Sequence, residues 1–195
     1  PLPHPPVVGL CKTPMWDSAL PETREAVENA AAAMKAAGAQ VRDFELPEEF
    51  DWLGDLRGII NGRERAVVMA DEWARNRDRL SEQMQKTIQD GLDLDHADYL
   101  DAMYLMETCR GRTTQAFEGC DVLLTPAVDG EAPMGLAATG SPRFQALWTM
   151  LYTPTITLPT HSGPNGLPVG IQLVSPYWAD RALMAISRWV LEACA

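Results

Sequence analysis

The residues that could carry chemistry in this chain are few and widely spaced along its 195 positions. None of the six serines lies in a Gly-x-Ser-x-Gly elbow, and His161 belongs to a turn sequence, so no Ser-His-Asp triad is indicated. Lys12, Lys35 and Lys86 are best explained as surface residues, and neither common phosphate-binding loop pattern is present. The residue types and spacing therefore indicate no complete catalytic centre.

The cysteines indicate buried free thiols rather than a metal site. They lie far apart and form no C-x-x-C pair: Cys11, Cys109, Cys120 and Cys194. Only three histidines could serve as additional ligands. We therefore expect no metal site and no cofactor.

The composition excludes some classes of partner. With 16 basic and 27 acidic residues the formal net charge is −11, which repels nucleic-acid phosphates and anionic lipid surfaces. No apolar run reaches the roughly 20 residues that span a bilayer, and the PLPHPP start does not resemble a signal peptide. We expect a cytoplasmic protein that binds neither nucleic acid nor membrane.

The elements that must position any site begin as an α/β pattern. An apolar strand over residues 7–11 is followed by an amphipathic helix from Pro21 to a stop at Gly38, and then by a strand over residues 39–46. Such a crossover normally places its two strands in parallel. Residues 48–90 are polar and prone to form helices.

The second half of the chain predicts two further helices, a helical turn and three more strands. Asp95 is expected to cap a long helix that reaches Phe117, and residues 121–125 form a buried strand. A loop to Pro142 and a helical turn over residues 144–152 follow.

Residues 155–158 and 169–174 are expected to be strands that pair antiparallel, because an Asn-Gly turn signal stands between them. Asp180 is then expected to cap a last helix with Leu183, Ile186 and Val190 facing inward. The fold class is α/β, and no internal repeat or sharp domain boundary is visible.

Four stretches carry a family resemblance: AAGAQVRDFELP, then DHADYLDA with the helix leading into CDVLLTPA, then FQALWTMLYTPTITLP, and finally NGLPVGIQLVSPYWADRALM. In this order they resemble the C-terminal half of the amidase signature family of hydrolases, over nearly the whole chain. The resemblance implies a mixed β-sheet flanked by helices. It also implies that residues 1–195 are the C-terminal part of an amidase domain.

The family's catalytic residues are a nucleophilic serine, a second serine reached through a cis peptide bond and a lysine base, together with a glycine-rich oxyanion loop. All of them lie in the family's N-terminal half, and this sequence has no Gly-Gly-Ser-Ser stretch. The resemblance therefore implies no catalytic residue here. We expect the C-terminal portion of a hydrolase of linear amides, inert alone; an N-terminal half, if encoded upstream of Pro1, would bring the catalytic centre.

The resemblance also places candidate substrate-binding residues. Thr125 and Pro126 stand at a strand end, and Trp148 and Tyr152 precede Pro154. The alternative is that all four belong to the plain core. Tyr152 stands where many relatives have glycine, so we expect its ring to narrow the pocket or make it more polar.

Two other functions stay open. The chain resembles the A-type subunit of glutamine-dependent amidotransferases as well as it does amidases, and a non-catalytic partner-binding module could retain this half of the fold. The expected partner is a small amide substrate in the complete enzyme. Exposed strand edges and an apolar face also predict that the isolated chain forms homo-oligomers or a loosened state.

Overall fold

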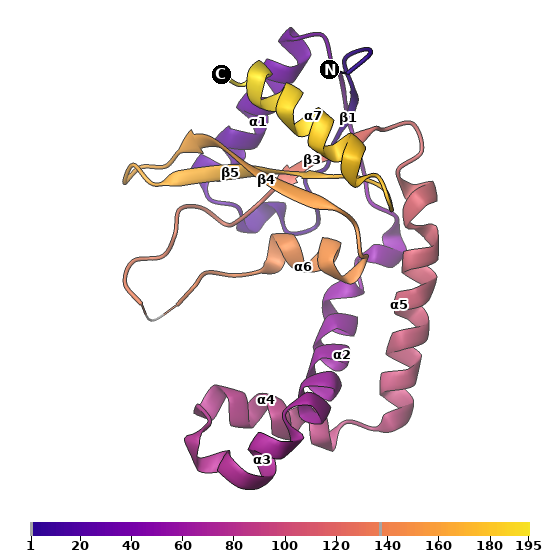
Figure 1. Cartoon of the computed structure of the whole chain (residues 1–195), viewed down its shortest axis with the longest axis vertical. Helices are drawn as coiled ribbons and strands as arrows, with labels where there is room; N and C mark the ends of the chain where they lie inside the picture. The colour runs from indigo at the N-terminus through magenta and orange to yellow at the C-terminus, as the bar shows by residue number, and fades with distance from the viewer. Residues whose placement is uncertain (1, 137) are drawn as a thin grey trace. The chain divides into compact units, whose positions relative to one another are not determined.

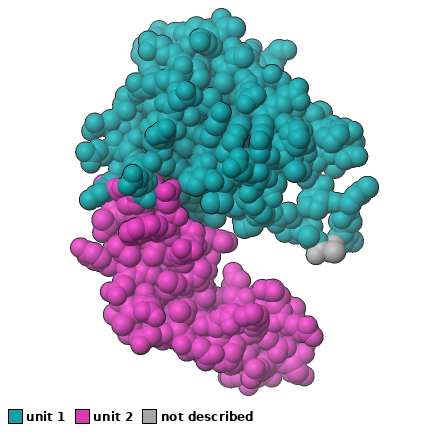
Figure 2. Space-filling view, turned by 180° about the vertical axis from the view of Figure 1, so that it is seen from behind, with its two compact units in different colours: residues 1–48, 112–195 teal, residues 49–111 magenta. Residues whose placement is uncertain are grey.

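The computed structural model describes residues 2–136 and 138–195 (Figure 1). The chain divides into two compact units, coloured separately in Figure 2: residues 1–48 with 112–195, and residues 49–111. The first unit contains the β-sheet, and the second is helical.

The sheet is mixed and has the strand order β2-β1-β3-β5-β4. Its strands are β1 (Val7–Leu10), β2 (Gln40–Asp43), β3 (Val122–Pro126), β4 (Thr155–Ser162) and β5 (Pro168–Val174). β1 pairs in parallel with β2 and β3, whereas β5 pairs antiparallel with β3 and β4. The expected parallel crossover, antiparallel pair and mixed sheet are therefore confirmed, although β2 is shorter and β4 longer than the sequence indicates.

One face of this sheet is covered by two helices, α1 (Pro21–Ala36) and α7 (Asp180–Ala193). Leu124 and Leu173, which are register partners on β3 and β5, join the buried faces of these helices in one apolar cluster. Figure 1 shows α7 and α6 (Arg143–Met150) on opposite sides of β4 and β5. The inward positions expected for α7 are confirmed, since Leu183, Ile186 and Val190 are buried in the cluster.

The opposite face of the sheet carries a row of polar side chains. Thr125 on β3 pairs with Gln172 on β5, which pairs with Thr157 on β4. Directly paired residues share a face, and successive residues alternate, so these three lie on the side away from Leu124 and Leu173. We call Thr125, Gln172 and Thr157 the polar row.

The two ends of α1 follow its sequence signals. Pro21 occupies the first turn, where a missing N–H is harmless. At the other end Gly38 has φ +100°, its N–H donates to the Lys35 carbonyl, and the Ala39 N–H donates to the Met34 carbonyl. This left-handed cap returns the chain directly to β2.

The start of α7 differs from the sequence prediction. The N-cap residue is Ala179, with no side-chain capping bond, and Asp180 is the first residue of the helix. The expectation that Asp180 caps the helix is wrong. Its carboxylate instead stands in the first turn, where it favours the positive end of the helix dipole.

The second unit consists of α2 (Leu53–Val68), α3 (Ala70–Asn76), α4 (Glu82–Asp93) and most of α5 (His96–Ala116). Short 3-10 turns lie at Glu48–Phe50 before α2 and at Arg77–Arg79 after α3, and a third, Trp16–Ser18, belongs to the first unit. The Asp95 carboxylate accepts a 2.9 Å hydrogen bond from the Ala97 N–H, which supports its expected capping role before α5.

The remaining sequence expectations concern thiols and membrane spans. Cys11, Cys109 and Cys120 are buried and Cys194 is half-buried, and among the described residues none of the four forms a disulfide. Within residues 2–136 and 138–195, no helix combines the length and apolar character that crossing a bilayer requires.

Candidate functional site

A hollow of the first unit lies between the loop that follows β3 and the end of the antiparallel pair. Its volume is about 930 Å³. The lining comes from residues 127–133 and 139–142 of the loop, from Gln145 on α6 and from β4 and β5. Figure 1 shows this loop extending away from β3 before it returns to α6.

Glu131 attaches the loop to the β4–β5 hairpin. Its carboxylate accepts hydrogen bonds from the Asn165 side chain at 2.7 Å, from the Asn165 N–H at 3.0 Å and from the Leu167 N–H at 2.9 Å. Desolvation raises the pKa of this carboxyl, but the bonds from Asn165, Leu167 and Gly166 outweigh it and leave the pKa below the ordinary value. The carboxylate is thus held in its charged form at one rim of the hollow.

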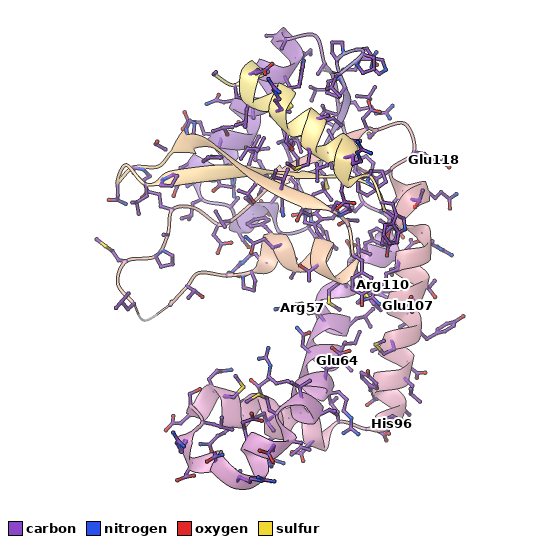
Figure 3. All side chains as sticks on the ribbon, viewed as in Figure 1. Arg57, Glu64, His96, Glu107, Arg110 and Glu118 are labelled. Atoms are coloured by element: carbon purple, nitrogen blue, oxygen red, sulfur yellow. The ribbon has the colours of Figure 1, made fainter. Side chains whose placement is uncertain are left out.

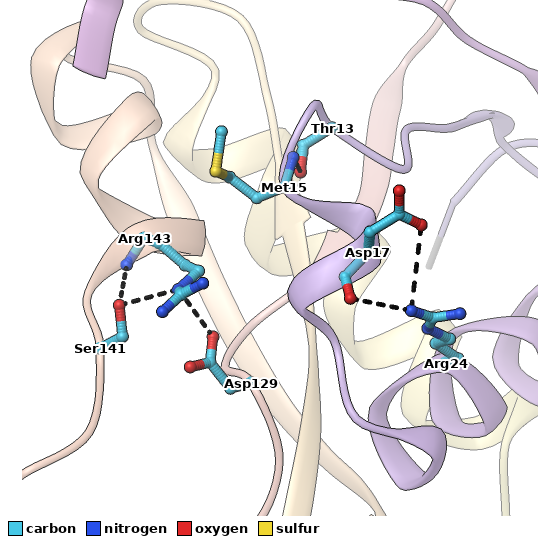
Figure 4. A network of polar contacts seen from close by, with 7 residues as sticks. All are labelled: Thr13, Met15, Asp17, Arg24, Asp129, Ser141 and Arg143. Atoms are coloured by element: carbon cyan, nitrogen blue, oxygen red, sulfur yellow. Dashed lines mark hydrogen bonds and ion pairs between the residues drawn. The ribbon is translucent and has the colours of Figure 1, made fainter. Parts of the chain in front are cut away.

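Arg143 fixes the other end of the loop (Figure 4). Its backbone N–H and its Nε donate to Ser141 Oγ at 3.3 and 3.0 Å, and its Nε lies 3.3 Å from Asp129 Oδ1. The Asp129 carbonyl accepts a 2.7 Å bond from the Leu20 N–H. Since Asp129, Ser141 and Leu20 all line the hollow, these contacts define its shape.

The lining suits binding better than bond cleavage. Most of it is apolar or neutral, and its two carboxylates are engaged by Arg143 and by the hairpin. Among the lining residues that the structure describes, none is Lys, His or Cys. The hollow can therefore hold a small uncharged molecule, and among its described lining residues only the carboxylates of Asp129 and Glu131 are possible bases.

The structure separates the candidate residues at the strand end. Thr125 and Pro126 are both buried on β3. As consecutive strand residues they face opposite sides of the sheet: Thr125 belongs to the polar row, while Pro126 pairs with Ile171 of the apolar cluster. Only Thr125 lies on the face that borders the hollow.

The other two candidates lie on and after α6. Trp148 is fully buried, and its Nε1 has no hydrogen-bond partner within the described residues. Tyr152 is 62% exposed and has φ +57°, a left-handed conformation that favours glycine. Neither residue lines the hollow, so their substrate-binding role stays a prediction.

Sequence reasoning overlooked Gln172. This side chain is 3% exposed, and its Oε1 has no hydrogen-bond partner among the residues described. The signal was present, because Gln172 is the one polar side chain in the apolar run of residues 169–174. A buried polar atom without a partner is uncommon in native structures and marks a position worth explaining.

A second overlooked residue belongs to the helical unit. Arg110 on α5 is 8% exposed and forms an ion pair with Glu107, one turn earlier (Figure 3). Among the described residues it is the sole charged side chain that is buried. Its burial follows from its place on the α5 stripe with Met106 and Thr113, which are also buried.

The model of the family described as Amidase matches residues 2–184. The chain belongs to the amidase family. The resemblance seen in the sequence and the expected fold are both confirmed for this family, and a solved amidase crystal structure superimposes with a TM-score of 0.86 at 27% identity, covering 97% of this chain and 46% of that one.

Curated relatives of this amidase-family chain include two kinds of protein. It is 28% identical to the 2-amino-5-chloromuconic acid deaminase of Comamonas testosteroni, over 92% of this chain and 41% of that protein. It is 29% identical to the A-type subunit of the glutamyl-tRNA(Gln) amidotransferase of Pseudomonas fluorescens, over 86% of this chain and 41% of that protein. The chain thus spans less than half the length of the curated relatives it matches.

Proposed function

We propose that this chain supplies sheet and substrate-pocket wall to a hydrolase of linear amides, and that it is inert on its own. One observation carries the proposal: the amidase model matches residues 2–184 of a chain that covers only 41% of a curated relative. The hollow adds support, because it offers a mostly apolar binding surface whose described lining residues include no Ser-Ser pair, lysine or histidine.

The four predicted residues have separate parts in this proposal. Thr125 lies on the face of the sheet that borders the hollow, and Pro126 ends β3 on the face of the apolar cluster. Trp148 is buried and anchors α6 through packing. Tyr152 is exposed after α6, and in this proposal its ring narrows the substrate pocket of the native-length protein. Changed substrate preference in Tyr152→Gly supports this role, and unchanged preference contradicts it.

The test compares the native-length protein with the isolated 195-residue chain. Ammonia release from a series of linear primary amides is measured for both. We expect activity only in the native-length protein, because the chain lacks a nucleophile and base in a common site. Hydrolysis by the isolated chain at a comparable rate contradicts its inertness, and no hydrolysis by either contradicts the amidase function.

A second candidate function is favoured by the similarity to the A-type subunits of glutamyl-tRNA(Gln) amidotransferases. Under this function the native-length protein would release ammonia from glutamine for an acceptor held by a partner protein. Glutamine therefore belongs in the amide series. Hydrolysis of glutamine with little activity on other amides selects this candidate, whereas broad activity selects the amidase.

A further inference from the structure

The hollow combines mostly apolar walls with charges on the loop that follows β3. Prolines, glycines and alanines supply most of its lining, and Gln145 and Thr157 add neutral polar side chains. Among the described lining residues the charged ones are Asp129 and Glu131. Apolar walls of this kind accept a hydrocarbon chain, and the few polar groups decide which ligands fit. The two carboxylates therefore determine which charged groups the hollow tolerates.

The two carboxylates differ in what holds them. Asp129 Oδ1 lies 3.3 Å from Arg143 Nε, so a guanidinium compensates its charge (Figure 4). The described donors to Glu131 are the side-chain amide and the backbone N–H of Asn165 and the N–H of Leu167, which are all neutral. Neutral donors hold a carboxylate in its charged form without cancelling that charge. The charge of Glu131 thus acts on whatever enters the hollow.

The Glu131 carboxylate is also fixed in position. A Cβ built on Gly163 would lie 2.5 Å from Glu131 Cδ, so the missing side chain at position 163 makes room for the carboxylate. The Gly163 N–H donates to the Leu167 carbonyl, which closes the loop around it. A charge held by preorganised donors does not have to rearrange when a ligand enters.

A third carboxylate reinforces the negative field. A Cβ built on Gly130 would lie 2.5 Å from Glu22 Oε1, so this side chain of α1 contacts the loop between Asp129 and Glu131. Three carboxylates thus stand against the guanidinium of Arg143 around this part of the loop. Summed charges of one sign set the local potential and select ligands of the opposite sign.

We infer that Glu131 sets the charge preference of the hollow, which accepts amides with a neutral or cationic far end and rejects amides that carry a second, anionic end. Glu131 is then a specificity-determining residue. This inference rests on the proposed function and names the class of amide that it acts on. A ligand carboxylate about 8 Å from Glu131 would be disfavoured about tenfold or more at an effective dielectric constant of about 20.

The first experiment measures kcat/KM of the native-length protein for two pairs of amides that match in shape. Adipamate carries a carboxylate where 6-methylheptanamide carries two methyl groups, and 5-aminopentanamide carries an ammonium where hexanamide carries a methyl group. We expect adipamate to be at least about tenfold worse than its partner, and 5-aminopentanamide to be equal to its partner or better. Equal values for adipamate and 6-methylheptanamide overturn the inference. Equal losses for the carboxylate and the ammonium also overturn it, because apolar walls alone would then reject any charge.

The second experiment removes the charge. Glu131→Gln keeps an acceptor oxygen, and we expect it to raise the ratio of adipamate to 6-methylheptanamide about five- to tenfold. Glu28→Gln is the matched control, because Glu28 is an exposed carboxylate of α1 outside the lining, and it should leave the ratio unchanged. Both substrates are measured on one preparation, so the ratio does not depend on the folded fraction. An unchanged ratio in Glu131→Gln contradicts the inference.

Salt provides a test that needs no variant. Raising the ionic strength from about 0.05 to 0.5 M shortens the Debye length severalfold, so the wild-type discrimination against adipamate should fall about threefold. Discrimination that does not change with salt contradicts an origin in the charge of Glu131.

Binding separates this inference from the proposed function. The backbone amide NMR signals of Gly130 and Gly170, which line the hollow, report binding of the four amides without turnover. Weaker binding of adipamate than of 6-methylheptanamide, with no amide hydrolysed, retains the charge preference and rejects the amidase. Hydrolysis of both at equal kcat/KM retains the amidase and rejects the charge preference. Failure of all four amides to shift these signals overturns the inference.

Discussion

Gly91 on α4 lies against the backbone of Gly62 on α2. A Cβ built on Gly91 would come within 2.0 Å of the Gly62 carbonyl oxygen and 3.2 Å of the Ala66 Cβ. Backbone atoms cannot move aside as the tip of a side chain can. The contact between α2 and α4 therefore requires glycine at position 91.

We predict that Gly91→Ala destabilises the helical unit by about 1–3 kcal/mol, the usual range for overpacking. Amide hydrogen exchange along α2 and α4 measures this directly. Gly58→Ala is the control, because a Cβ at Gly58 on α2 meets nothing within 4 Å. Replacing that exposed glycine should stabilise α2 by about 0.5–1 kcal/mol. Similar effects of the two substitutions would contradict the close packing.

Tyr152 supplies a second test, of backbone strain. It follows α6 in the left-handed conformation, its N–H donates to the Thr149 carbonyl, and the Thr153 N–H donates to the Trp148 carbonyl. This pattern usually ends on glycine. We expect Tyr152→Gly to be about 1 kcal/mol more stable than Tyr152→Ala in urea unfolding, because both remove the ring but only glycine removes the Cβ. Equal stability of the two variants would show that the conformation carries no strain.

We predict that the attachment of Glu131 to the loop between β4 and β5 depends on pH. Its pKa is lowered in the folded chain, so its contribution to stability is present above the unfolded pKa and is lost as pH falls through the folded value. The amide proton shifts of Asn165 and Leu167 should therefore change together below the ordinary glutamate range.

Glu131→Gln should abolish this titration, because the variant side chain does not ionise. The control is Glu28→Gln, which alters an exposed carboxylate on α1 and should leave the loop titration unchanged. If the two amide shifts still titrate in Glu131→Gln, another group controls the loop.

The cysteines should differ in reactivity. Burial raises the pKa of the Cys11 thiol to about 12, against a smaller contribution from a hydrogen bond to Thr13 that lowers it. At neutral pH its thiolate fraction is about a thousandfold below that of an ordinary cysteine. We predict that iodoacetamide modifies the half-buried Cys194 well before Cys11, as mass spectrometry of labelled peptides would show. Equal labelling in the native state would contradict the burial of Cys11, and equal labelling in urea is expected.

The isolated 195-residue chain should associate. β2 and β4 are the edges of the sheet, and β4 is eight residues long. Large apolar side chains including Val68, Tyr104 and Trp178 are exposed. Sedimentation should therefore show oligomers of the isolated chain. A compact monomer that unfolds cooperatively would favour an autonomous partner-binding module instead.

Most elements of the fold could be predicted from the sequence because their signals are local. Pro21 and Gly38 mark the ends of the first helix, and the apolar run of residues 169–174 marks a buried strand. The start of α7 was misplaced by one residue, because the Leu183 N–H donates to the Ala179 carbonyl and the helix begins at this pairing, whereas the sequence signal is the side chain of Asp180.

The candidate site was less predictable, because it depends on contacts between distant residues. Glu131 binds Asn165, which is 34 positions away, and this pairing gives the loop its shape. Gln172 is significant only through its register with Thr125 and Thr157. Alternation within one strand indicates that a residue is buried, but it does not indicate which polar atoms lie beside it or whether they are satisfied.

The order of the strands also affects how the chain can fold. β1 pairs with β3, and the Val7 N–H donates a hydrogen bond to the Asp121 carboxylate, 114 positions away. The helices of the second unit are formed by residues that lie between these two strands in the sequence. At synthesis rates of about 5–20 residues per second, β1 is synthesised roughly 6–23 seconds before β3. During that interval α2 and α4 can already pack against each other. The edge of β1 that later pairs with β3 stays without a partner strand. The sheet is therefore the late, aggregation-sensitive step of folding, and chaperone dependence is expected to concentrate there.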